Sequence, residues 1–110
     1  MRGKVGAKGK ICVMFSIKVS KHQRNQMLNM CDADILDSNI VQGDLTMHIS
    51  KSYYGGEMVD AAKASDLLKN SSIINMVGKN TVSLSIQLGI GSKDGVKKIS
   101  GVPFLIVFKT

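Results

Sequence analysis

The stretch ICVMFSIKV, Ile11–Val19, decides the fold class of this chain. Apolar residues occupy every second position from Val13 to Val19, and Ser16 and Lys18 fall between them. This period of two is typical of a strand with one buried face. The pattern predicts a β-strand at the start of the folded part of the chain.

The sequence after this strand predicts a hairpin. The polar segment SKHQR, Ser20–Arg24, suits a turn, and NQMLNMC, Asn25–Cys31, is a second strand, although Asn and Gln are poor strand formers. Asp32–Val41 then predicts one short helical turn that Asp32 or Asp34 could cap. A turn at Gly43-Asp44 leads to a further alternating strand, Leu45–Ser50.

The rest of the chain mixes helical and extended patterns. Asp60–Asn70 has the period of an amphipathic helix, and the apolar run Ile73–Val77 predicts a short strand or an extended segment. Thr81–Ile90 alternates strictly, so periodicity alone predicts a strand there. Phe104–Phe108 (FLIVF) is apolar at every position, which is typical of a central strand covered on both faces. Val96–Ile99 could form a further short strand.

These elements predict an α+β fold with two layers: a mixed or antiparallel sheet with about two helices on one face. A chain of 110 residues forms one domain with a small core. We assign 11–110 to this domain. Met1–Lys10 (MRGKVGAKGK), which has three Gly and four Lys/Arg, is expected to be a flexible basic arm.

Three segments resemble the archaeal family called domain of unknown function 424. They are Tyr53-Tyr54-Gly55-Gly56-Glu57, Ile73–Gly78 (IINMVG) and Gly101-Val102-Pro103, and the resemblance extends from Ile11 to Thr110. It implies a small two-layer α+β domain of the archaeal cytoplasm, and a helix rather than a strand at Asn80–Leu88. We follow the resemblance for that segment. It implies no activity, and Phe104 stands where the family pattern usually has a His.

The positive charge lies at one end of the chain. From Asp32 onward eight basic residues balance eight acidic ones, so the net charge of +7 belongs to the residues before Asp32. Such asymmetry points to a polyanionic partner, above all RNA, although a solubilising tail is the plain alternative. The seven cations predicted to bind nucleic acid are Arg2, Lys4, Lys8, Lys10, Lys18, Lys21 and Arg24.

A second candidate is a contact loop around the paired glycines. Glycine lets a backbone approach a ligand, and a tyrosine ring can stack on a base, but a turn whose tyrosines cover the edge of the core is the simpler interpretation. The loop comprises Tyr53, Tyr54, Gly55, Gly56 and Glu57. His48 lies on the outward side of its strand, where a solvated surface is the simpler interpretation.

The sequence indicates no metal site, no cofactor and no small-molecule substrate. Cys12 and Cys31 lack the spacing of zinc ligands and are expected to be reduced, buried thiols, with a cross-strand disulfide as the alternative. No apolar run is long enough to span a bilayer, and no His–Asp pair or phosphate-binding loop can be recognised. We expect a cytoplasmic protein without a membrane partner.

The charge asymmetry favours a small, non-catalytic protein that binds RNA or the ribosome through the arm and the first hairpin. The first alternative is a protein–protein interaction module, expected to be a homodimer joined through the sheet or the Tyr-Tyr-Gly-Gly loop. An enzyme is the third interpretation, and Tyr54, Glu57 and His48 are its candidate residues.

Overall fold

A computed structural model describes residues 13–109. Its three α-helices are α1 (Lys51–Tyr54), α2 (Ala61–Asn70) and α3 (Lys79–Gln87). The strands in this range are β1 (Phe15–His22), β2 (Asn25–Asp32), β3 (Asn39–Gln42), β4 (Leu45–His48), β5 (Glu57–Val59), β6 (Ile73–Val77), β7 (Lys97–Ile99) and β8 (Val102–Phe108). The predicted arm, Met1–Lys10, lies outside the described residues.

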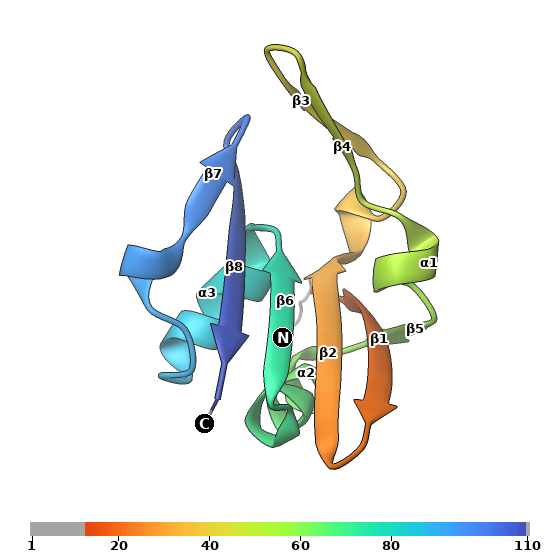
Figure 1. The fold of residues 1–110 in the computed structure, drawn as a ribbon, viewed down its shortest axis with the longest axis vertical. Coiled ribbons are helices and arrows are strands. Elements are labelled where there is room, and N and C mark those ends of the chain that lie inside the picture. The colour runs from red at the N-terminus through yellow and green to blue at the C-terminus, as the bar shows by residue number, and fades with distance from the viewer. Residues whose placement is uncertain (1–12, 110) are drawn as a thin grey trace, which may run out of the picture.

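Six strands form one mixed sheet in the order β5-β1-β2-β6-β8-β7, and β3 and β4 form a separate hairpin that projects from it (Figure 1). The hairpins β1–β2 and β7–β8 are antiparallel. Strands β2 and β6 at the centre are parallel, with Met30 opposite Met76. The sheet therefore consists of an N-terminal half and a C-terminal half that join along one parallel pair.

Helices α2 and α3 cover one face of the sheet. Both carry apolar side chains at helical spacing, and these pack on the inward residues of every long strand. The buried core of this layer contains Phe15, Ile17, Leu28, Met30, Val59, Ala64, Leu68, Ile74, Met76, Val82 and Leu105. This arrangement confirms the α+β class expected from the sequence.

The opposite face of the sheet is only partly covered. A second cluster of buried side chains, Cys31, Ile40, Ile49 and Val77, lies where the β3–β4 hairpin meets the sheet, and Phe104 packs against it. Helix α1 covers another part of this face. The remaining surface, along β6 and the second half of β8, is called here the open face.

The segment Thr81–Ile90 is helical as far as Gln87 and does not form the strand that its alternation predicts. Helix α3 buries Thr81, Val82 and Ser85, and Leu84, Ile86 and Leu88 pack at the edge of the core. The helix begins after Gly78 because Asp32, at the end of β2, supplies the cap: its carboxylate accepts hydrogen bonds from the N–H groups of Asn80 and Thr81. The helix implied by the family resemblance is therefore confirmed.

Other local predictions need correction. The segment predicted as a loop at Ser52–Glu57 includes most of α1 and the start of β5, because Ser50 caps α1 through its side chain. Strand β3 was not predicted. Strand β8 lies between β6 and β7 but is not covered on both faces: Ile106 is 59% exposed and Phe108 is 70% exposed. The helix-facing side chain of Leu105 lies in the main core, and on the opposite face Phe104 packs against the second cluster.

Cys31 is a buried, free thiol. Cys12, which would be its partner in the alternative disulfide, lies outside the described residues. Burial, with additional repulsion from Asp32 and Asp34, raises the pKa of the Cys31 thiol from 9.0 to about 12. Cys31 therefore behaves as a small core side chain and not as a reactive one.

Candidate functional site

Helix α1 is attached to the sheet by three hydrogen bonds to its last carbonyl groups. Lys18 Nζ donates to the carbonyl of Ser52 at 2.8 Å, Asn29 Nδ2 to that of Tyr53 at 3.1 Å, and Ser16 Oγ to that of Tyr54 at 2.8 Å. The last carbonyls of a helix have no partner within the helix, so polar side chains on the sheet satisfy them. These hydrogen bonds hold the Tyr-Tyr-Gly-Gly segment in place over the sheet.

The two glycines of this segment have different structural roles. A Cβ on Gly55 would lie 2.6 Å from the carbonyl oxygen of Lys51, so a side chain cannot fit against the end of α1. Gly56 has a φ of +140°, a conformation that other residues rarely adopt. The simpler interpretation, in which this loop turns the chain, accounts for both glycines without a ligand.

The tyrosines of this segment differ in exposure. Their rings make an edge-to-face contact with centroids 4.9 Å apart, and Tyr53 is 48% exposed. Tyr54 is half-buried, and burial is the main cause that raises the pKa of its phenol to about 12. Tyr53 is therefore the ring available to a partner. Glu57 is exposed at the start of β5.

Next to α1, polar and apolar side chains lie side by side on neighbouring strands of the open face. Asn75 lies opposite Asn29 on one side and Ile106 on the other, and Asn75 Nδ2 donates to Asn29 Oδ1 at 2.7 Å. Ile73 and Phe108 form the neighbouring pair. Exposed large apolar side chains that gather on one surface mark an interaction site more often than single ones do. The apolar composition of FLIVF predicted that Ile106 and Phe108 lie in the core, but no element covers them on this face and they are exposed.

The cations predicted to bind nucleic acid do not form one patch within the described residues. Lys18 lies on the open side of β1 and is bonded to α1, whereas Lys21 lies three residues further on and faces the helix layer. Arg24 is exposed in the turn between β1 and β2. The other four predicted cations, Arg2, Lys4, Lys8 and Lys10, lie outside the described residues.

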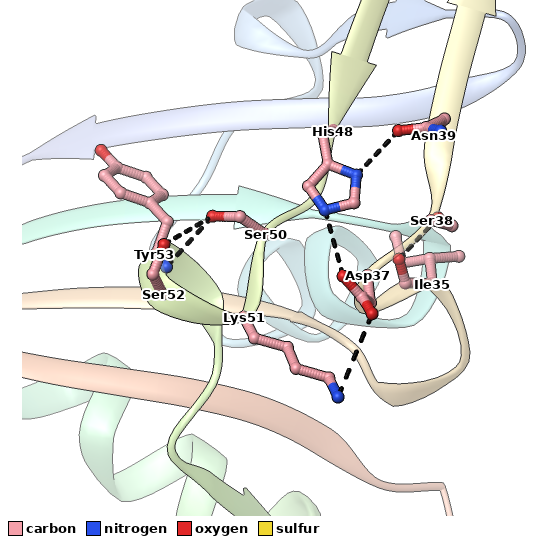
Figure 2. Close-up of polar contacts among 9 residues, drawn as sticks. All are labelled: Ile35, Asp37, Ser38, Asn39, His48, Ser50, Lys51, Ser52 and Tyr53. Carbon is pink, nitrogen blue, oxygen red and sulfur yellow. Dashed lines mark hydrogen bonds and ion pairs between the residues drawn. The ribbon is translucent and has the colours of Figure 1, made fainter.

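A His–Asp pair, not recognisable in the sequence, forms at the base of the β3–β4 hairpin (Figure 2). His48 Nε2 lies 3.0 Å from Asp37 Oδ1, and His48 Nδ1 lies 2.7 Å from Asn39 Oδ1. Lys51 Nζ lies 4.0 Å from the other Asp37 oxygen. Both ring nitrogens of His48 are engaged, so neither is available to activate a nucleophile in this arrangement. The pair ties the hairpin to the short turn before it.

Among residues 13–109, no group of His, Cys, Asp or Glu side chains has the arrangement of a metal site. Within the same range, no helix is long and apolar enough to cross a membrane.

The fold and this surface define a small α+β domain with one helix-covered and one partly open sheet face. Residues 20–110 match the family described as "Protein of unknown function (DUF424)", and the chain belongs to this family.

The chain is also similar to a solved structure, "Crystal structure of an uncharacterized conserved protein from Methanopyrus kandleri". The two share 20% sequence identity with a TM-score of 0.70, over 88% of this chain and 94% of that chain. At this identity the similarity concerns the fold alone. No curated protein matches the chain.

Proposed function

We propose that this protein is a non-catalytic, cytoplasmic RNA-binding protein, and that single-stranded RNA, free or within the ribosome, lies on the open face. The exposure of Ile106 and Phe108 on that face is the observation that carries the proposal. A base can stack on a phenylalanine ring or pack on an aliphatic side chain whatever its identity, and this contact is worth about 1–3 kcal/mol per base.

The neighbouring side chains suit the same partner. Asn75 presents an amide beside Ile106, and amides can hydrogen-bond to the edges of unstacked bases. Tyr53 adds a second exposed ring from α1, which is bonded to Asn29 on the adjacent strand. Lys97 lies opposite Phe104 in the β7–β8 hairpin, and cross-strand partners share a face, so it brings a cation to the edge of this surface.

Phosphate contacts would come from the basic residues at the N-terminal end. The seven Lys and Arg side chains before Asp32 are the excess charge of the chain. If about four of them contact phosphate, log K should fall with log salt concentration at a slope of roughly −3 to −4. Deletion of Met1–Lys10 should flatten this slope.

The experiment distinguishes base stacking from electrostatic attraction as the source of RNA affinity. Binding of a fluorescein-labelled 12-nucleotide oligouridine is measured by anisotropy for the wild type, Phe108→Ala and Leu45→Ala. Leu45 is a matched control, since it is exposed and apolar but lies at the tip of the β3–β4 hairpin. We expect about a tenfold loss for Phe108→Ala at an unchanged salt slope, and no loss for Leu45→Ala. Equal affinity of all three proteins would contradict the proposal.

The same exposed pair, Ile106 and Phe108, also favours a second candidate function, a homodimer joined through the open face. Sedimentation velocity over a hundredfold concentration range distinguishes the two. A dimer that Phe108→Ala converts to a monomer, together with unchanged RNA affinity, would replace RNA binding by self-association.

A further inference from the structure

A groove of about 630 Å³ lies between α3 and the β7–β8 hairpin. The groove is separate from the open face, because it lies on the helix-covered side of the sheet. Lys97 and Lys98 are successive residues of β7 and point to opposite faces of the sheet, and Lys98 is the one that lines the groove. The lining residues are Lys79, Val82, Ser83, Ile86, Gln87, Lys93, Val96, Lys98, Gly101 and Pro103.

Helix α3 forms one wall of the groove, and its lining side chains are arranged in two rows. Lys79, Ser83 and Gln87 follow one another at intervals of four residues, so they form a polar row along the helix. Val82 and Ile86, also four residues apart, form an apolar row beside it. A molecule in the groove would therefore meet hydrogen-bonding groups and aliphatic surface side by side.

The charge of the groove is entirely positive. Lys79, Lys93 and Lys98 come from three separate segments, and no lining residue is acidic. The ion pairs found among residues 13–109 involve Asp37 and not these lysines. The nearby carboxylate of Asp32 is occupied by hydrogen bonds to Asn80 and Thr81. Three cations around one groove complement a multiply charged anion.

We propose that this groove binds a nucleoside phosphate. The volume lies in the range of small-molecule sites, roughly 300–1,000 Å³. Lysine is a common phosphate ligand, because it acts as a compact charge that needs no fixed orientation. The aliphatic floor of Val82, Ile86, Val96 and Pro103 accepts the flat face of a base, and Ser83 and Gln87 offer polar contacts to its edge or to the ribose. An inorganic anion would leave this floor unused.

The site is independent of the proposed RNA surface, and neighbouring variants can test it. Binding of ADP, GDP and UDP to the full chain is measured by isothermal titration calorimetry at low salt, with inorganic phosphate and adenosine as partial ligands. We expect at least one nucleotide to bind with a Kd below 1 mM, and both partial ligands to bind about tenfold or more weakly. Absence of saturable binding by all three nucleotides would overturn the proposal.

Lys98→Glu and Lys97→Glu form the matched pair. Each introduces the same charge change at adjacent positions of β7, but only Lys98 lines the groove. We expect Lys98→Glu to weaken nucleotide binding by about tenfold or more, and Lys97→Glu to leave it within about twofold. Equal losses in both variants would show general charge attraction and would refute a built site.

Amide chemical shifts locate the ligand without relying on affinity. On addition of the bound nucleotide, shifts confined to α3 and the residues around Lys93 support the groove. Shifts on the open face around Asn75 and Ile106 would instead place the nucleotide on the proposed RNA surface, and the groove proposal would then be wrong.

Discussion

Asp32 accepts hydrogen bonds from both the backbone N–H and the hydroxyl of Thr81, each at 2.8 Å, across a sequence separation of 49 residues. The carboxylate thus caps a helix to which it is not adjacent in sequence. Gly78, the residue before α3, has no side chain to serve as the cap, and a Cβ there would lie 2.5 Å from the carboxyl carbon of Asp32. The end of β2 and the start of α3 are therefore fitted to each other.

Replacing Asp32 by Ala should destabilise the protein by roughly 2–4 kcal/mol, because a helix cap is lost and the buried donors of Thr81 are left unpaired. Gly78→Ala should also be destabilising, through its φ of +112° and its clash with Asp32. In the double variant the clash between residue 78 and the Asp32 side chain is absent. The loss of unfolding free energy in the double variant should therefore be smaller than the sum of the losses in the two single variants. Urea denaturation of the four proteins measures this coupling. Strict additivity would show that the two sites are independent.

Ser85→Ala should leave stability unchanged or raise it. Ser85 Oγ is buried and has no hydrogen-bond partner among the described residues, so its hydroxyl carries a desolvation cost without a compensating bond. Ser71→Ala is the matched control, since this buried hydroxyl donates to the carbonyl of Leu67 at 2.6 Å. Thermal melts should show a lower Tm for Ser71→Ala only. A lower Tm for Ser85→Ala would indicate a bound water or another partner at that hydroxyl.

Stability should fall as the pH rises above about 9. Burial raises the pKa of Cys31 from 9.0 to about 12 and is the main cause that raises the pKa of Tyr54 from 10.0 to about 12. The unfolded chain then loses these protons at lower pH than the folded chain does, so alkali favours unfolding between about pH 9 and 12. Urea midpoints measured from pH 7 to 11 test this slope. A Cys31→Ala, Tyr54→Phe variant should show a flatter dependence, and an identical slope would assign the effect to other groups.

Gly55→Ala and Gly56→Ala should each destabilise by more than about 1 kcal/mol, for different reasons. Gly55 has an ordinary negative φ but no room for a Cβ beside Lys51, whereas Gly56 has a positive φ. Gly43→Ala gives a reference for conformation alone, because Gly43 has a φ of +60° and no atom near its would-be Cβ. Chemical denaturation of the three variants measures these losses. A Gly55 variant as stable as the wild type would show that the single turn of α1 can open to make room for the side chain beside Lys51.

Local patterns predicted most of the strands and helix α2, since period and capping act within a few residues. The first hairpin, Ile73–Val77 and the helix after Asp60 follow from such signals. They failed at α3, because the cap of this helix is Asp32, far away in the chain. The alternation of apolar residues does not reveal that Val82 and Leu84, which point to different sides of α3, both pack against the core.

The candidate surfaces were less predictable than the fold. FLIVF is apolar throughout, so composition placed Ile106 and Phe108 in the core, whereas their exposure depends on where the β3–β4 hairpin and α1 end. The groove could not be predicted from the sequence either. Lys79, Lys93 and Lys98 belong to a part of the sequence with no net charge, and only the packing of α3 beside β7 collects them.

The parallel β2–β6 pair also affects how the chain can fold. Asn29 and Asn75 meet across 46 residues, whereas each hairpin closes over a short turn. Closing the longer segment costs more entropy before any contact offsets it, so β2–β6 docking should limit the folding rate. We expect Ile74→Val at this pair to slow folding, and Ile40→Val in the projecting hairpin to speed unfolding only. Stopped-flow refolding that is slowed equally by both would place the hairpin in the transition state.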